Sequence, residues 1–182
     1  HEAVYTASGV DYMTAPKKWD DAFTQESFDK MISAVEGKYS FIFFDSPAGI
    51  SGGFLLAGNC ADRAIAVSTP DNVCVKAAAR AIEELEALGI EDTKLVINRF
   101  DKPMTQKGKF LNLDETIDGV AAQLIGVVPE DKAITFASST GFVELEDCPA
   151  KAAYERIALR ISGLYVNLKL KNKKKKSKGK KA

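Results

Sequence analysis

Short apolar runs separated by helix-like stretches dominate this chain. Continuous apolar runs are typical of strands buried on both faces, and parallel sheets joined by crossover helices bury their strands in this way. The sequence therefore predicts an α/β fold with a mostly parallel sheet and helices on both faces. The predicted strands are residues 3–6, 41–44, 64–67, 95–97 and 125–128.

Helix patterns occupy most of the chain between these runs. Thr24 can cap a helix that Gly37 ends, and Pro149 suits the first turn of the last helix. The apolar stripe of that last helix is predicted to contain Ile157, Ile161, Leu164 and Leu168. The predicted helices are residues 24–36, 71–88, 113–124, 131–139 and 149 onward, and residues 9–21 and 101–112 are predicted loops.

The 182 residues are enough for one domain of ordinary size. The chain starts at His1 and enters a strand-like run almost at once. Because domains rarely begin inside their own sheet, we expect that an N-terminal part is missing.

Charge is segregated along the chain. Nine lysines and no acid lie between residues 169 and 181, so the rest holds 16 of the 25 Lys and Arg residues against all 25 Asp and Glu residues. The body therefore sits near −9, although the formal net charge is +0. We expect an acidic domain over residues 1–164 and a lysine-rich tail over residues 165–182, either disordered or membrane-associating.

Composition excludes several classes of protein. His1 is the only histidine and stands at the chain end, so histidine-based catalytic or metal sites are excluded. The three cysteines are odd in number and lack CxxC spacing, which favours free thiols in a reducing compartment. No apolar run approaches the roughly 20 residues of a spanning helix, and no secretory leader is present. We therefore expect a cytoplasmic protein.

Polar residues follow three of the predicted strands. Ligands of parallel α/β sheets bind beyond the carboxyl ends of the strands, so these residues are the candidates for a site. Each group also has an ordinary structural interpretation, as a helix N-cap, a strand-end turn or a helix start. The three groups are Asp45, Ser46, Pro47, Ala48 and Gly49; Asn98 and Arg99; and Pro129, Glu130 and Asp131.

Taken together, the three groups suit a nucleotide. Asp45 can orient Mg²⁺ through water beside the phosphates, as a Walker B aspartate does. Gly49 lets the backbone approach the terminal phosphate. The Asn98 amide offers both a donor and an acceptor to an adenine edge. The prediction is that the three strand ends converge on one purine nucleotide.

Several stretches closely resemble the bacterial cell-division ATPases of the MinD family, in the MinD/ParA superfamily of P-loop NTPases. The resemblance covers about residues 5–164, and residues 45–50 favour MinD over its chromosome-partitioning ParA relatives. It rests on residues 41–50, 61–70, 97–99, 107–108, 113–114, 126–131 and 137–138.

The resemblance implies a function and a set of roles. Such proteins bind ATP and Mg²⁺, form a homodimer around two nucleotides, associate with the inner face of the cell membrane and place the division septum. Division-inhibitor and topological-regulator proteins are the implied partners. Asp45 would be the catalytic residue that holds the Mg²⁺ water network, and Gly49 would sense the γ-phosphate. The implied ATP-binding residues are Ser46, Pro47, Gly49, Asn98, Arg99, Pro129, Glu130 and Asp131.

The sequence departs from the family at two places. No segment matches the family's glycine-rich phosphate loop with its lysines, so we expect adenine recognition without ATP hydrolysis by this chain alone. The helix on which the family binds its division partners carries Lys76 and Arg80 here instead of acidic residues.

The tail has three possible roles. Its leucines and tyrosine form a modest apolar patch, and each neighbouring lysine can add about 1 kcal/mol near an anionic membrane. The same lysines can neutralise nucleic-acid phosphates, although no aromatic residue lies among them for base stacking. A disordered solubilising tail is the third role. The predicted membrane residues are Leu164, Tyr165, Leu168, Lys169, Leu170, Lys171, Lys173, Lys174, Lys175 and Lys176.

Two hypotheses follow. The first is a MinD-type ATPase present as a fragment without its phosphate-binding loop. The second is a non-catalytic paralogue or a ParA-type partition protein, whose basic tail binds membrane or nucleic acid. Nucleotide binding by the purified chain distinguishes the two.

Overall fold

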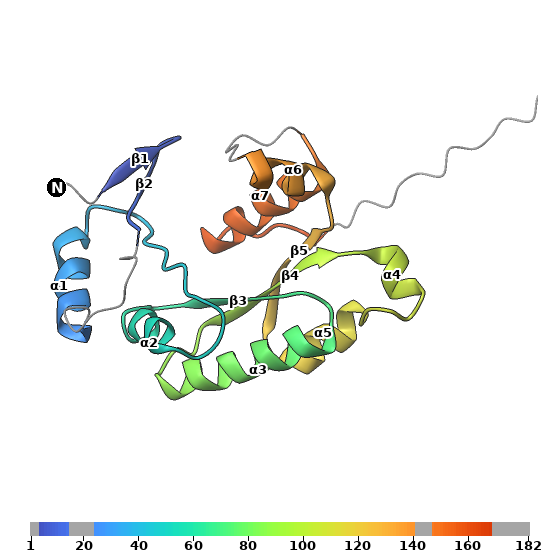
Figure 1. Ribbon diagram of the computed structural model, residues 1–182, viewed down its shortest axis with the longest axis horizontal. Coiled ribbons are helices and arrows are strands. Elements are labelled where there is room, and N and C mark those ends of the chain that lie inside the picture. The colour runs from blue at the N-terminus through green and yellow to red at the C-terminus, as the bar shows by residue number, and fades with distance from the viewer. Residues whose placement is uncertain (1–3, 15–23, 141–146, 169–182) are drawn as a thin grey trace, which may run out of the picture.

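Three parallel strands form the main sheet of the protein. The computed structural model describes residues 4–14, 24–140 and 147–168. Strands β3 (Ala64–Ser68), β4 (Thr93–Phe100) and β5 (Gln123–Pro129) lie side by side in that order, all parallel (Figure 1). The predicted parallel α/β sheet is confirmed.

One face of the sheet is covered by the two crossover helices. α3 (Asn72–Ala87) connects β3 to β4, and α5 (Leu113–Val120) lies on the connection from β4 to β5 (Figure 1). Leu95 and Ile97 of β4 are fully buried and pack with Val75 of α3 and Val120 of α5. The alternation of a strand puts these two residues on the same face, two positions apart.

The opposite face of β4 and β5 is covered by α7 (Pro149–Ile161). Val96, which lies between Leu95 and Ile97, packs there with Ile157 and Ala153 of α7. α6 (Lys132–Thr140) follows β5 and contributes Ile134 to this cluster. Helices therefore cover both faces of the sheet, as predicted.

A third, smaller cluster joins α2 to the end of α3. α2 (Gly52–Asn59) buries Phe54 against Leu85 and Ile90. This helix was not predicted, because its glycine-rich start resembles a loop. The short helix α4 (Lys102–Gln106) was also missed, inside the predicted loop 101–112.

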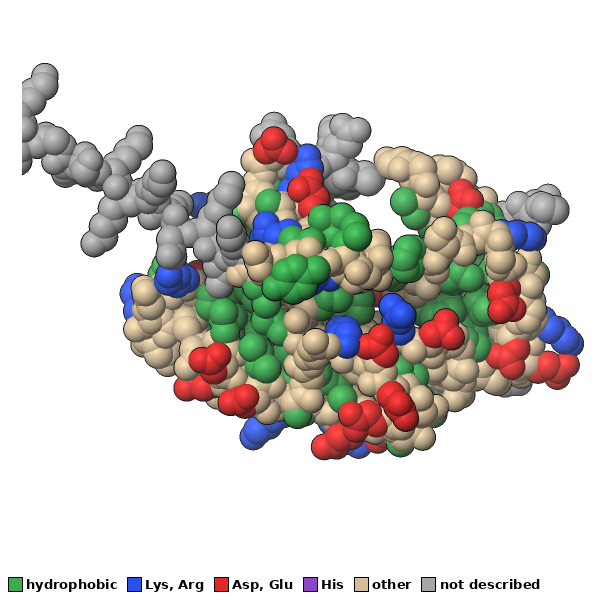
Figure 2. Space-filling view, turned by 180° about the vertical axis from the view of Figure 1, so that it is seen from behind, with side chains coloured by type: hydrophobic (Ala, Val, Ile, Leu, Met, Phe, Trp, Pro, Cys, Tyr) green, Lys and Arg blue, Asp and Glu red, His purple; other side chains and the backbone are tan. Residues whose placement is uncertain are grey.

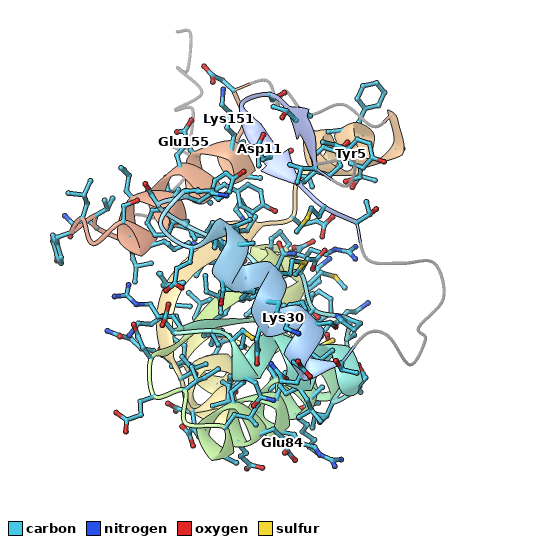
Figure 3. The ribbon with its side chains drawn as sticks, turned by 90° about the vertical axis from the view of Figure 1, so that its left-hand side faces the viewer. Tyr5, Asp11, Lys30, Glu84, Lys151 and Glu155 are labelled. Carbon is cyan, nitrogen blue, oxygen red and sulfur yellow. The ribbon has the colours of Figure 1, made fainter. Side chains whose placement is uncertain are left out.

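The N-terminal part is built differently from the sheet. β1 (Tyr5–Ala7) and β2 (Val10–Tyr12) form a separate antiparallel hairpin, and every described residue of both strands is exposed. The predicted opening strand therefore exists but lies outside the main sheet, and the predicted loop 9–21 begins with a strand. α1 (Gln25–Val35) has the predicted Thr24 cap, and it buries no residue. Figure 3 shows Tyr5 and Asp11 on the hairpin and Lys30 on α1.

Residues 41–44 do not form a strand, and that prediction is wrong. They have no regular secondary structure, and Phe41 and Phe43 are 50% and 71% exposed. A strand exists only where a neighbouring strand satisfies its backbone groups. No described residue provides that neighbour, so the apolar run does not enter a sheet.

Several predicted boundaries also shift. The helix predicted over residues 113–124 ends at Val120, because Ala121 adopts a left-handed conformation, and Leu124 belongs to β5. The last helix ends at Ile161, so Leu164 and Leu168 of its predicted stripe lie beyond it. Asn98 and Arg99 lie inside β4 rather than after it.

Acidic side chains gather along one edge of the face shown in Figure 2. This edge is the lower rim of the molecule, the side on which α3 lies in Figure 1. Hydrophobic side chains gather in the middle of the face shown in Figure 2. Among the described residues, no helix combines the length and the hydropathy needed to cross a membrane.

Candidate functional site

A pocket of about 270 Å³ opens at the carboxyl ends of β4 and β5. This is the rim of the sheet at which ligands of parallel α/β folds bind. Five of the predicted ATP-binding residues line it, from two neighbouring strand ends. The lining residues are Asn98, Arg99, Val128, Pro129, Glu130, Asp131, Ile134, Thr135, Ser138 and Tyr154.

An irregularity near the end of β4 shapes the first wall of the pocket. The pairing of β4 with β5 shifts between Ile97 and Phe100, and Arg99 has a φ of 53°. Bulges of this kind re-aim side chains next to binding sites. The Asn98 Oδ1 accepts a hydrogen bond from the Arg99 N–H at 2.9 Å. The NH₂ group of Asn98 donates to no other described residue, so it is available to a ligand.

An ion pair forms the rim of the pocket. The Arg99 Nε donates to the Glu130 Oε2 at 2.8 Å, and the charge and hydrogen bond of Glu130 raise the pKa of Arg99. The two side chains are 69% and 37% exposed, so solvent screens this pair and it adds little to stability. The Glu130 N–H also donates to the Phe100 carbonyl at 3.0 Å, which ties the two strand ends together.

Asp131 is held by two helices. Its Oδ1 accepts from the Ala133 N–H of α6 at 3.0 Å, and its Oδ2 accepts from the Ala150 N–H of α7 at 3.3 Å. Both carboxylate oxygens are therefore engaged by backbone donors at helix starts, where such bonds are stabilising. The sequence predicted Asp131 as a ligand contact, and the structure places it in the lining of the pocket with both carboxylate oxygens bonded to helix starts.

The rest of the wall comes from α6 and α7. Ile134, Thr135 and Ser138 are spaced along α6 at intervals of one and three residues, and Tyr154 comes from the second turn of α7. Sequence reasoning did not assign these residues to a site. Only Ser138 lies in a stretch that resembles the family, and only the packing of α7 against β5 brings Tyr154 to this rim.

The Asp45 group lies apart from this pocket. Asp45, Ser46, Pro47 and Gly49 precede α2, are exposed, and do not line the pocket. Gly49 has a φ of +88° with open space around its Cα, a conformation that favours glycine. The prediction that three strand ends meet is thus reproduced for two of them in the described structure.

The Asp45 carboxylate is compatible with a hydrated cation. It accepts no hydrogen bond from any other described residue, and Mg²⁺ commonly uses one or two carboxylates together with substrate phosphates. No group of three His, Cys, Asp or Glu residues suited to a metal occurs among the described residues. Most of the remaining ligands would therefore come from water and phosphate.

Hydrogen bonds from Arg160 connect the start of the tail to β5. The Arg160 guanidinium donates to the carbonyls of Ile125 and Val166, and Ile125 is the extra residue at a pairing irregularity of β5. Burial lowers the pKa of Arg160. Leu164, Tyr165 and Leu168 are 56%, 92% and 53% exposed. The predicted tail residues Lys169, Leu170, Lys171, Lys173, Lys174, Lys175 and Lys176 lie outside the described residues.

Several curated proteins are similar in sequence to this chain. The septum site-determining protein MinD of Synechocystis is 32% identical over 82% of this chain, and that of Bacillus subtilis is 33% identical over 82%. This chain spans 57% of each relative, a little over half of their length. No protein-family model matches it.

Solved structures share its fold. MinD of Aquifex aeolicus matches with a TM-score of 0.74 and 31% identity, covering 80% of this chain and 64% of that one. A MinC:MinD complex from the same organism matches at 0.72 and 31%, covering 80% and 62%. A Pyrococcus horikoshii MinD with Mg-ADP matches at 0.73 and 20%, covering 88% and 67%.

The parallel sheet, its two helical layers and these likenesses define a protein of the MinD/ParA superfamily of P-loop NTPases. Within that superfamily, the chain is most plainly similar to MinD proteins, at 31% to 33% identity over 80% to 82% of its length.

Proposed function

We propose that this chain is the adenine-binding part of a MinD-type septum site-determining ATPase. The observation that carries the proposal is the pocket in which Asn98, Arg99, Pro129, Glu130 and Asp131 meet at the ends of β4 and β5. The sequence similarity to MinD proteins supports the proposal, and so does the Mg-ADP bound to the Pyrococcus horikoshii protein.

The pocket residues have different roles in binding the base. The free NH₂ group of Asn98 donates to a ring nitrogen of adenine. The Arg99–Glu130 pair holds the rim of the pocket, and Asp131 keeps α6 and α7 in place behind it. Asp45 would hold Mg²⁺ through water, with Ser46, Pro47 and Gly49 beside the phosphates. The metal would neutralise phosphate charge.

Saturation-transfer NMR with ATP tests the base site. This method detects the weak binding that we expect from a chain without a lysine-bearing phosphate loop. Asn98→Ala should weaken ATP binding about tenfold, which is about 1.4 kcal/mol and typical of a lost hydrogen bond. Asn59→Ala is the matched control, because Asn59 lies in α2 and bonds to Gln25 instead of lining the pocket. No transfer from the chain to millimolar ATP would refute the proposal.

The chain alone should not hydrolyse ATP. Phosphoryl transfer depends on positioned positive charge, and the sequence has no lysine-bearing phosphate loop. Phosphate release by this chain should therefore equal that of Asp45→Ala. Joining the strand, glycine-rich loop and helix of a relative to the chain should restore hydrolysis, and Asp45→Ala should then abolish it.

We further propose ATP-dependent homodimerisation and reversible binding to the inner face of the cell membrane. The Leu164, Tyr165 and Leu168 side chains are exposed directly before the lysine-rich residues, which supports a peripheral membrane contact. Sedimentation with anionic liposomes and retardation of DNA, each at two salt concentrations, separate membrane binding from nucleic-acid binding. The MinC:MinD complex of Aquifex aeolicus suggests a division inhibitor as protein partner.

A further inference from the structure

We infer that Tyr154 of α7 is the base-contacting wall of the pocket, and that Asp131 positions it. This inference rests on the proposed function and deepens it, because it assigns the base to residues outside the motifs. Tyr154 lines the pocket with residues from both strand ends, although it lies 25 residues beyond Pro129 in the chain.

The environment of Tyr154 fits contact with a ligand better than a role in the core. Its side chain is 40% exposed, whereas Ala150, Ala153 and Ile157 of the same helix are at most 8% exposed and pack on the sheet. The Tyr154 hydroxyl makes no hydrogen bond to another described residue. A half-exposed aromatic ring with an unused hydroxyl offers a flat apolar surface, and purine bases stack on such surfaces.

The other lining residues supply the apolar surface and the polar group that a planar base needs. Val128 and Pro129 supply apolar surface from the strand end, Ile134 supplies it from α6, and Asn98 supplies the polar group. Arg99 is already paired with Glu130, so the described residues around the base offer little unpaired positive charge. This arrangement suits the neutral base of a nucleotide rather than its phosphates.

Asp131 sets where the Tyr154 ring lies. Its carboxylate joins the start of α6 to the start of α7, and Ala150 is one helical turn before Tyr154. The N-terminal half of α7 is therefore bonded to Asp131, which itself lines the pocket. Lys151 and Glu155, which lie on either side of Tyr154 along α7, are labelled in Figure 3.

Nucleotide titration followed by NMR tests the ring directly. ATP and adenosine are titrated into the wild-type chain, because adenosine reports on the base without phosphates. Tyr154→Ala should weaken both ligands about tenfold, and Tyr154→Phe should keep both within about twofold of wild type. Leu159→Ala is the matched control, since Leu159 is also on α7, is 42% exposed and does not line the pocket. Its affinity should be unchanged.

A double-mutant cycle tests the positioning role of Asp131. Asp131→Asn puts an NH₂ group against one of two backbone donors, so exchange of the Ala150 amide should accelerate and adenosine affinity should fall about threefold. In the Tyr154→Ala background the same change should have no further effect on affinity, because the ring it positions is gone. Equal losses in both backgrounds would overturn the positioning role.

The outcomes separate this inference from the proposed function. If wild type binds ATP and adenosine, and Tyr154→Ala binds them with the same affinity, the inference is overturned and the proposed function is unaffected. If wild type binds adenosine and both Asn98→Ala and Tyr154→Ala weaken that binding, the result supports the proposed function and the inference. Absence of ATP and adenosine binding to wild type overturns both together.

Discussion

The two halves of this protein have similar sequence patterns, but their apolar runs are buried to different extents. From Ala64 to Ile161, apolar runs pair into a parallel sheet with buried cores on both faces. From Tyr5 to Gly49, comparable runs lie in an exposed hairpin and in an unpaired stretch at residues 41–44. An apolar run becomes a buried strand only when a neighbouring strand satisfies its backbone.

The boundary between the halves lies at β3. This strand pairs only with β4 within the described chain, and Ile65 and Val67 remain 37% and 61% exposed on the face opposite α3. An unpaired edge with apolar side chains favours association with another strand. The comparison therefore predicts a stable C-terminal half and a weakly held N-terminal half.

Hydrogen exchange should show the largest difference between the halves. Amides of Val96 and Ile97, in the central strand, should exchange at least about 1000-fold more slowly than those of Ile42 and Phe43. The reason is that the former open only with the whole sheet, whereas the latter have no backbone partner among the described residues. Native-state exchange followed by NMR measures this ratio. Comparable protection in both segments would contradict the comparison.

Large-to-small substitutions should lower the free energy of unfolding far more in the C-terminal half than in the N-terminal half. Ile97→Ala removes a fully buried side chain and should lower the free energy of unfolding by about 2 to 5 kcal/mol. Phe43→Ala removes a larger side chain that is 71% exposed, so the change should stay within about 0.5 kcal/mol. Urea denaturation measures both values. An equal loss in the two variants would show that residues 41–44 share the same core.

Adding a Cβ at a glycine should destabilise the C-terminal half by an intermediate amount and leave the N-terminal half unaffected. A Cβ at Gly126 would lie 2.2 Å from the Ile157 Cγ1, so Gly126→Ala should destabilise by about 1 to 3 kcal/mol. Gly126→Ala combined with Ile157→Ala should be less destabilised than the sum of the single changes. Gly49→Ala meets no atom, and its local strain should leave global unfolding unaltered. Thermal unfolding of the four variants checks these relations.

Helix caps should give the smallest effect. Asp71→Ala removes the N-cap of α3, which packs in the core, and should cost about 1 kcal/mol. Thr24→Ala removes the N-cap of α1, which buries no residue, and should not alter global unfolding. Circular dichroism during urea denaturation compares the two. A larger loss for Thr24→Ala would reverse the proposed order of stability.

The Asp71 cap also predicts a pH dependence. The Thr69 hydroxyl, helped by the amides of Cys74 and Val73, lowers the pKa of Asp71. The native carboxylate is therefore favoured, and its contribution is complete above the unfolded pKa of about 3.9. That contribution is lost as the pH falls through the lower native pKa. The stability difference between wild type and Asp71→Ala should thus shrink in acid.

Sequence reasoning located the polar strand ends but not the complete site. Asn98 and Pro129 were found because a parallel sheet brings the carboxyl ends of its strands together. Tyr154 was missed, since no local pattern distinguishes a pocket aromatic from a core aromatic on a helix. Asp131 was found as a pocket residue, but its bonds to two helices were not foreseen, because a carboxylate that caps two helices and one that binds a ligand look the same in sequence.

The sequence by itself determined the α/β class, the cap at Thr24, the central strands and the resemblance to MinD, because these depend on local periodicity and on motif order. The tertiary structure alone decided that residues 41–44 stay unpaired, that Asp131 joins α6 to α7, and that Tyr154 reaches the pocket. Those outcomes depend on which distant segments become neighbours. A backbone or side-chain partner far along the chain leaves no local signal in the sequence.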